Sequence, residues 1–213
     1  MKEDQVSFPC GEISLEGVLG LPEGKGPFPA VVVCHPHPLY GGSMDNNVVY
    51  AVCAGLGREA IAWLRFNFRG VGRSEGSFAN GIGEQEDVKA ALTFLETRCE
   101  INPTKLALCG YSFGTMVCIP VANADERVQA IAGISPFFVS EGLLKGYARP
   151  KFFVYGTGDG FINRKEIEYI ISELPDPKSY EMIPEADHFW WGYEGQLETK
   201  VGDFFASVLK QKP

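Results

Sequence analysis

The stretch "LALCGYSFGTMV" (residues 106–117) decides the fold of this chain. It begins with apolar residues typical of a buried strand and ends with small and apolar residues suited to a helix. Between them Gly110, Ser112 and Gly114 form the pattern G-x-S-x-G. Glycine on both sides of the serine permits a turn so tight that larger side chains would clash. The stretch predicts a strand–turn–helix unit that exposes the Ser112 hydroxyl; this context disfavours the alternative, a Gly-Ser turn without catalytic meaning.

Strand-like and helix-like patterns alternate along the rest of the chain. Apolar runs of strand length occur at 30–34, 61–68, 105–112, 128–135 and 151–157. Apolar residues with helical spacing occur at 84–96, 164–174 and 196–210. This alternation predicts a mostly parallel sheet with right-handed crossovers and helices on both faces. Near the start, "QVSFPC" and "ISLEGVLGL" predict an antiparallel pair at the sheet edge.

Length and charge narrow the class of protein. The chain has 213 residues, 45% of them apolar, which predicts a single domain over 1–213. The net charge is -8 and no basic run occurs, so nucleic acid is not an expected partner. Its apolar runs are strand-sized and its start resembles no signal peptide, so we expect no membrane partner and a cytoplasmic location. A homodimer is compatible with the sequence, which leaves the oligomeric state open.

A serine hydroxyl is a poor nucleophile at neutral pH and needs a base. The chain has three histidines, and two of them precede the serine pattern. His188 follows it, in "IPEADHFWWG", between a strand pattern near 178–183 and the last helical pattern. We therefore expect His188 to be the base, with an ordinary surface histidine as the alternative interpretation.

The acid that orients the histidine should follow another strand. In "KFFVYGTGDGFIN", Asp159 comes just after a strand pattern, in a glycine-rich turn. Asp and Gly also form purely structural turns, but the order Ser112, Asp159, His188 favours the catalytic interpretation. Asp176 and Asp187 are the weaker candidates.

That order of nucleophile, acid and base is expected of α/β-hydrolases. From the strand pattern at 30–34 to its end, the chain resembles this superfamily, and it is most similar to small, nearly lidless serine hydrolases of the dienelactone hydrolase type. The stretches "HPHPLYGGSMDN" and "NFRGVGRSEG" resemble one poorly characterised subgroup. The resemblance implies an α/β-hydrolase fold and an acyl-enzyme mechanism on a small-molecule ester, without a cofactor. Dienelactone hydrolases proper carry Cys where this chain has Ser112, a departure that favours ordinary carboxylic esters over the lactone.

The loop "HPHPLYGG" (35–42) is the expected source of one oxyanion donor. One backbone N–H should come from Phe113, directly after the nucleophile. Resemblance to the family's His-Gly-x pattern makes His37 N–H the second donor, with Tyr40 N–H as the alternative. The two prolines of the loop have no N–H to offer.

The same loop raises the question of a metal site. His35 and His37, one residue apart, could form half of one. On an extended chain, however, their rings point to opposite faces, and no further ligand cluster is apparent. We expect no metal, and rings that buttress the loop through hydrogen bonds. In "FNFRGVGRSEGSF" we expect Arg69 and Arg73 to be structural anchors, because a phosphate-binding pattern is incomplete there.

Aromatic residues crowd the segments that should border the site. We expect a narrow apolar substrate pocket formed by Leu39, Tyr40, Phe137, Phe161 and Trp190. About fifteen residues separate the strands at 128–135 and 151–157, so any lid should be small, and short acyl groups are favoured. A peptidase, a thioesterase, an acyltransferase or a non-catalytic binding protein of the same fold remain alternatives.

Overall fold

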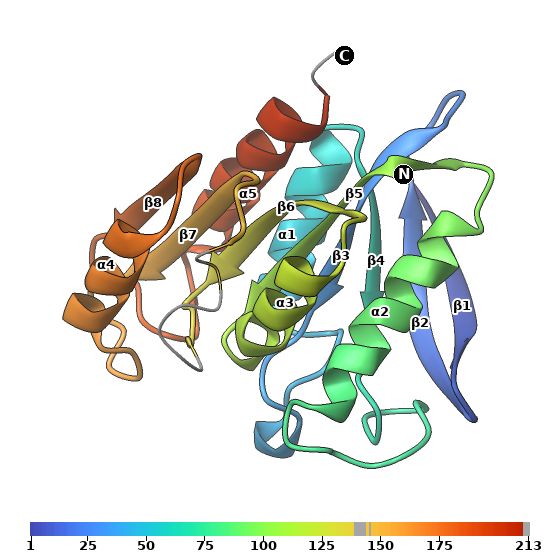
Figure 1. Cartoon of the computed structure of the whole chain (residues 1–213), viewed down its shortest axis with the longest axis horizontal. Coiled ribbons are helices and arrows are strands. Elements are labelled where there is room, and N and C mark those ends of the chain that lie inside the picture. Colours follow the sequence, from blue (N-terminus) through green and yellow to red (C-terminus); the bar gives the residue numbers. More distant parts are fainter. Residues whose placement is uncertain (139–143, 145, 211–213) are drawn as a thin grey trace.

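The computed structural model describes residues 1–138, 144 and 146–210, and all eight strands found there form one sheet (Figure 1). The order across the sheet is β1-β2-β4-β3-β5-β6-β7-β8. The strands are β1 (Lys2–Cys10), β2 (Ile13–Leu21), β3 (Phe28–Cys34), β4 (Ala62–Phe66), β5 (Ile101–Tyr111), β6 (Val128–Ile134), β7 (Lys151–Gly156) and β8 (Lys178–Ile183).

The first two strands form the antiparallel edge that the sequence predicts. β1 pairs antiparallel with β2, and β2 pairs antiparallel with β4. All the pairs from β4 to β8 are parallel. The central strands are buried on both faces, which explains why β3 and β5 read as continuous apolar runs rather than alternating ones.

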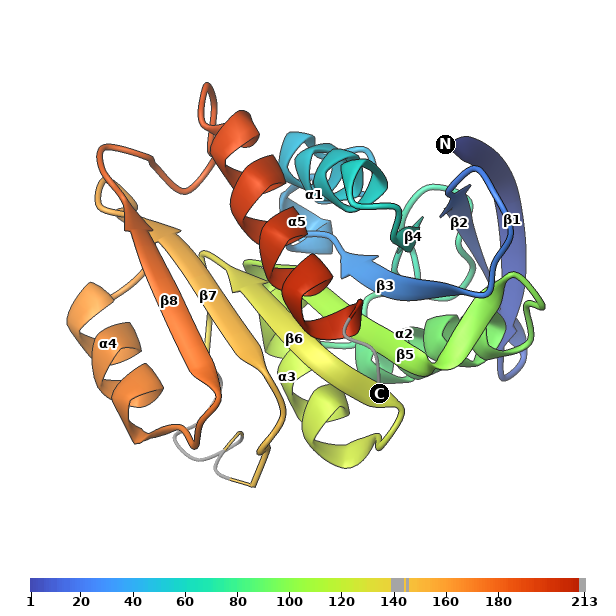
Figure 2. The same cartoon turned by 90° about the horizontal axis from the view of Figure 1, so that it is seen from above.

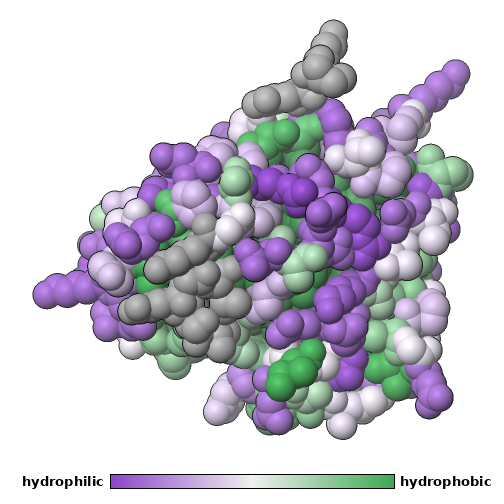
Figure 3. Space-filling view, viewed as in Figure 1, coloured by the Kyte–Doolittle hydropathy of each residue, from purple (hydrophilic) through white to green (hydrophobic). Residues whose placement is uncertain are grey.

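Helices cover both faces of the sheet. Those in the described residues are α1 (Asn47–Arg58), α2 (Gly83–Glu96), α3 (Phe113–Ala124), α4 (Arg164–Glu173) and α5 (Glu194–Leu209), with a short 3₁₀ turn at Pro38–Tyr40. Two apolar cores result: α1 and α5 pack on one face, and α2, α3 and α4 pack on the other (Figure 2). The outward surfaces of α2 and α4 are largely hydrophilic (Figure 3).

Helix α1 is absent from the helical patterns that we derived from the sequence. Its apolar residues form an almost continuous run, because α1 is covered by the sheet on one side and by α5 on the other. Two glycines permit that contact. A Cβ on Gly55 would lie 2.1 Å from the carbonyl oxygen of Glu198, and one on Gly202 would lie 2.8 Å from the carbonyl oxygen of Gly55.

The parallel strands all end at the same edge of the sheet, and the loops that carry the candidate residues begin there (Figure 1). The small lid that the sequence allows would belong to the β6–β7 connection, where residues 139–143 and 145 lie outside the described residues. Within the described part of the chain, no helix is long and apolar enough to cross a bilayer.

Candidate active site

The turn between β5 and α3 holds Ser112 in a left-handed backbone conformation, with φ 54° and ψ −118°. Residues other than glycine rarely adopt this backbone conformation, and such strain is typical of a serine nucleophile in a G-x-S-x-G turn. The flanking glycines make the turn possible. A Cβ on Gly110 would lie 2.4 Å from the backbone nitrogen of Thr115, and one on Gly114 would lie 2.3 Å from the carbonyl oxygen of Cys34. The first turn of α3 therefore packs directly against the end of β3.

Ser112, His188 and Asp159 come together at this edge although the sequence separates them widely. The Ser112 Oγ lies 3.0 Å from Nε2 of His188. Nδ1 of His188 lies 2.9 Å from Oδ2 and 3.1 Å from Oδ1 of Asp159. Because a carboxylate accepts hydrogen bonds, Nδ1 carries the proton and the lone pair of Nε2 faces the hydroxyl. This arrangement can remove the serine proton.

The Asp159 carboxylate is buried, which alone would raise its pKa. Hydrogen bonds from the side chains of His188 and Ser135 oppose that effect, as does the Phe161 N–H, 3.0 Å from Oδ1. Together they hold the pKa of Asp159 below its usual value. The carboxylate is therefore ionised at neutral pH and can stabilise an imidazolium on His188.

The loop that carries His188 is fixed by residues close to it in sequence and in space. The Tyr111 hydroxyl donates a hydrogen bond of 2.6 Å to the His188 carbonyl oxygen. Asp187, a weaker candidate for the acid, instead accepts hydrogen bonds from the backbone nitrogens of Phe189 and Trp190 with Oδ1. Its role in the structure is to cap the turn after the histidine.

The structure corrects the expected position of two pocket residues. Trp190 is fully buried in the core between the sheet and α5, and its Nε1 donates to the Ser135 Oγ at 3.0 Å. Its backbone has a left-handed φ of 63° in the irregular turn after His188, where strand-like alternation does not apply. Leu39, in the 3₁₀ turn, is 67% exposed and also lies outside the lining of the cavity described next.

A cavity of about 770 Å³ opens over Ser112. Tyr40, Phe137 and Phe161, which the sequence predicts for the pocket, do line it. The ring of Phe161 lies 4.8 Å from that of His188, and 62% of its surface is exposed. The other lining residues are Pro36, His37, Gly41, Gly42, Asn46, Tyr111, Phe113, Met116, His188 and Phe189.

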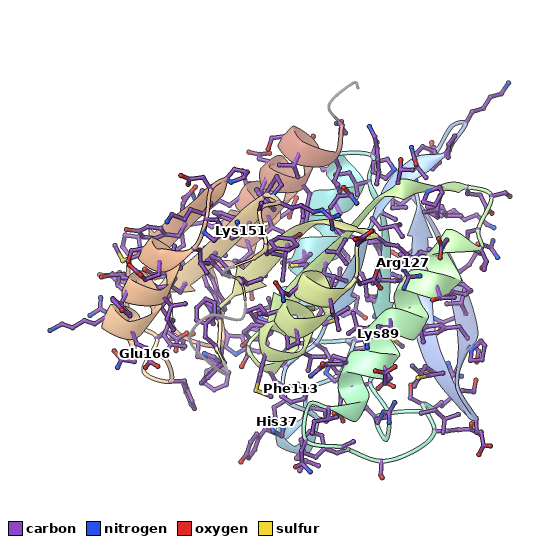
Figure 4. The ribbon with its side chains drawn as sticks, in the orientation of Figure 1. His37, Lys89, Phe113, Arg127, Lys151 and Glu166 are labelled. Carbon is purple, nitrogen blue, oxygen red and sulfur yellow. The ribbon has the colours of Figure 1, made fainter. Side chains whose placement is uncertain are left out.

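His37 lies in an aromatic cluster at one side of the cavity (Figure 4). The centroid of its ring is 4.8 Å from that of Phe113, 4.8 Å from Tyr40 and 5.0 Å from Phe78. Its Nδ1 accepts a hydrogen bond of 3.2 Å from the Leu39 N–H. Burial against this cluster lowers the pKa of His37, so the ring is mainly neutral at pH 7.

His35 is buried beneath the same loop. Its Nδ1 donates to the Pro36 carbonyl oxygen at 2.7 Å, and its Nε2 accepts from the Phe68 N–H at 3.1 Å. Burial lowers the pKa of His35 to about 4. Because both ring nitrogens are engaged, this histidine buttresses the loop and has no lone pair free for a metal.

The two arginines of "FNFRGVGRSEGSF" form ion pairs away from the cavity. Arg69 lies 2.7 Å from an oxygen of the buried Asp87, and Arg73 lies 2.7 Å from Glu16. Each tethers the loop after β4 to a neighbouring element, the anchoring role that the sequence suggests.

The sequence offers no reason to select Ser135 or Tyr111 as site residues. In the structure Tyr111 donates to the His188 carbonyl oxygen, and Ser135 accepts from Trp190. Tyr111 is the second residue of the G-x-S-x-G pattern and Ser135 directly follows β6. A polar residue at the carboxyl end of an otherwise apolar strand was the available signal for Ser135. Its partner Trp190, however, lies on a different loop, and the local sequence pattern does not indicate that the two residues meet.

Comparison with known proteins agrees with this architecture. The model of the "Dienelactone hydrolase family" matches residues 79–190. An uncharacterised protein of Rickettsia prowazekii is 30% identical over 190 residues, covering 84% of this chain and 79% of that protein. A solved Xanthomonas campestris protein described as an α/β serine hydrolase without a lid is 27% identical, with a TM-score of 0.84 over 100% of this chain and 98% of that one.

A thiohydrolase of Arthrinium phaeospermum is 32% identical over 126 residues, which cover 57% of this chain and 39% of that protein. The match to the family model includes Ser112, Asp159 and His188, and the solved relative extends the likeness over the whole chain. This protein belongs to the dienelactone hydrolase family and has the α/β-hydrolase fold.

Proposed function

We propose that the protein is a serine hydrolase of small carboxylic esters. The observation that carries this proposal is the hydrogen-bonded chain from Ser112 through His188 to Asp159, located at the cavity. A strained serine, a histidine with its free lone pair on the hydroxyl and a buried ionised carboxylate are the parts that acyl transfer requires.

In the first step, Nε2 of His188 takes the Ser112 proton while Oγ attacks the carbonyl carbon of the ester. The C–O bond to the alcohol then breaks, and the imidazolium returns its proton to the departing alkoxide. In the second step, His188 takes a proton from water, and the resulting hydroxide attacks the acyl-enzyme. The acid leaves and Ser112 recovers its proton. Asp159 stabilises the imidazolium in both steps and is not itself protonated.

Two backbone N–H groups would stabilise the oxyanion. The Phe113 N–H, at the start of α3, is one, and the His37 N–H is the other. Tyr40 is the weaker candidate, because its N–H already donates to the His37 carbonyl oxygen at 3.1 Å. One such donor contributes about 3–4 kcal/mol to transition-state stabilisation.

The cavity favours uncharged substrates with a short or flat apolar acyl group. Aromatic rings form much of its lining, and no Asp, Glu, Lys or Arg occurs among the lining residues in the described part of the chain. An anionic lactone would find no cation there to pair with its carboxylate. A cytoplasmic location and a homodimer stay predictions from the sequence.

The proposal is tested by labelling the purified protein with a fluorophosphonate and by following p-nitrophenyl acetate hydrolysis. Labelling at Ser112 is expected, and Ser112→Ala should abolish it and lower turnover on the order of 10⁴-fold or more. Ser172→Ala, on the exposed side of α4, is the control and should react as the native protein does. Labelling that persists at another serine in Ser112→Ala would overturn the assignment.

Thioester hydrolysis is the second candidate, favoured by the likeness to the thiohydrolase. The same three residues can cleave either bond, since the fold and the triad do not set the leaving group. Matched oxyesters and thioesters with one acyl group distinguish them. A kcat/KM for the thioester at least 10-fold above that for the oxyester would replace the first proposal by the second.

A further inference from the structure

We propose that Ser135 and Trp190 are positioning residues that act through Asp159 and tune the basicity of His188. This inference rests on the proposed serine hydrolase function. It concerns a second line of polar contacts, which runs from Trp190 through Ser135 toward Asp159.

Ser135 directly follows β6 and is fully buried. Its backbone has a left-handed φ of 43°, and its N–H donates a hydrogen bond of 2.8 Å to the Val154 carbonyl oxygen of β7. A side chain in this rare conformation needs a surrounding structure that compensates the strain. At this position its hydroxyl lies close enough to the Asp159 carboxylate to help lower the pKa of that group.

The orientation of that hydroxyl is set by Trp190. An indole N–H can only donate, so the Ser135 Oγ must accept the 3.0 Å hydrogen bond from Nε1. The single hydroxyl proton of Ser135 is then left for Asp159. The line of donors therefore runs in one direction, from Trp190 to Ser135 to Asp159.

The position of Trp190 couples two loops. It lies two residues after His188, and its ring is fully buried in the core beside α5. One rigid side chain thus anchors the loop of the base and, through Ser135, contacts the acid. Small displacements of such groups cost catalysis more than substrate binding.

The charge on Asp159 is shared among three donors: Nδ1 of His188, the Phe161 N–H and the Ser135 hydroxyl. Each donor that stabilises the carboxylate weakens its attraction for the imidazolium. Removal of the Ser135 hydroxyl should therefore strengthen the Asp159–His188 interaction and favour the imidazolium form. The acid limb of the kcat/KM profile reports how readily the base of the free enzyme takes up a proton.

Ser135→Ala tests the inference, measured with p-nitrophenyl acetate between about pH 5 and 9. The acid limb should move up by about 0.5–1 pH unit. The kcat should fall roughly 10-fold with KM nearly unchanged, because Asp159 loses a contact that positions it and the cost of misplacement outweighs the stronger ion pair. Trp190→Phe keeps a buried aromatic ring but removes the donor. It should shift the limb in the same direction by a smaller amount, and the double variant should shift it no further than Ser135→Ala alone.

Ser74→Ala is the matched control. Its Oγ is also buried and also links two backbone groups, accepting from the Glu16 N–H and donating to the Asn67 carbonyl oxygen, but it contacts none of the three catalytic residues. It should lower the urea midpoint and leave the acid limb in place.

Ser135→Ala with an unshifted acid limb would overturn the inference, even if its stability falls. Fluorophosphonate labelling of Ser112 in the same samples separates this result from failure of the proposed function. A native protein that does not label refutes the serine hydrolase itself.

Discussion

Two polar clusters at the carboxyl ends of the strands have similar construction and different chemistry. The first is the proposed catalytic chain, formed by Ser112, His188 and Asp159 with Ser135 and Trp190 behind them. The second is the arginine cluster, formed by Arg65, Asp45, Asn67, Glu16 and Arg73, which joins β2 and β4 to the segments around residues 43–45 and 71–73. Both connect distant segments through hydrogen bonds, but Asp45 and Arg73 of the arginine cluster are exposed to water.

In the arginine cluster every charge has an opposite charge beside it. Arg65 pairs with Asp45, and Arg73 lies 2.7 Å from Glu16. The burial of Glu16 would raise its pKa, but hydrogen bonds from Arg73 and Asn67 outweigh that effect and lower it. The pKa values of its two carboxylates, Glu16 and Asp45, are both lowered, so the cluster can hold loops but does not exchange protons near neutral pH.

The catalytic chain contains one acid and one imidazole, with a hydroxyl at its open end. A histidine is the one side chain whose ordinary pKa lies near neutrality, so this cluster can take and return a proton. Both clusters connect loops through hydrogen bonds. The cluster around Ser112 can also transfer a proton, because its histidine lies between an ionised acid and a cavity.

Asp159→Asn should break the catalytic chain with the largest effect. The amide would donate to Nδ1 and favour the tautomer that has its proton on Nε2, so the base would no longer face Ser112. Activity should fall on the order of 10³–10⁴-fold. Steady-state kinetics with p-nitrophenyl acetate measure this loss, and Asp45→Asn in the arginine cluster is the control. A variant that keeps a tenth of the native kcat would show that Asp159 is not the orienting acid.

His35 allows a test of stability. Its Nε2 accepts a hydrogen bond from the Phe68 N–H and so connects the loop 35–42 to the segment after β4. Its pKa is about 4 in the folded protein and about 6.5 when unfolded. The unfolded chain therefore binds more protons in this window, and stability is full above about pH 6.5 and declines as the pH falls toward 4. The loss should approach about 3 kcal/mol at the low end.

Urea unfolding of the native protein and of His35→Gln at pH 7 and pH 5 measures this contribution. Paired carboxylates contribute little above about pH 5, so this interval reports mainly on histidines. His37 contributes equally to both proteins, and the difference between them isolates His35. The variant should be less stable at pH 7, and its stability should change less between the two pH values. Equal pH dependence in the two proteins would contradict a buried neutral His35.

Glu16→Gln should have the smallest effect of these substitutions, and kcat and KM should stay unchanged. It removes the charge that pairs with Arg73 and should lower the free energy of unfolding by about 1–2 kcal/mol at pH 7. Because the pKa of Glu16 is lowered in the folded state, its contribution exists above about pH 4.3 and disappears as the pH falls further. Chemical unfolding at pH 7 and 3.5 checks the sign. A shifted acid limb of kcat/KM would show that the two clusters are coupled.

The features of this protein that depend on local conformation can be predicted from its sequence. Glycines on both sides of Ser112 specify the tight turn because any Cβ there would meet backbone atoms. Continuous apolar runs identify buried parallel strands, and strand ends identify where Asp159 and His188 must lie. Nearness in sequence was enough, because turn geometry and strand burial are set by neighbouring residues.

The contacts between groups far apart in sequence became visible in the folded structure. It turned Trp190 from an expected pocket residue into a buried donor to Ser135, 55 residues away in sequence. It also placed Leu39 outside the cavity and buried α1 under α5. A hydrogen bond between two loops depends on the order of the strands in the sheet and on the backbone conformation of each loop. Neither property produces a periodic pattern in the sequence.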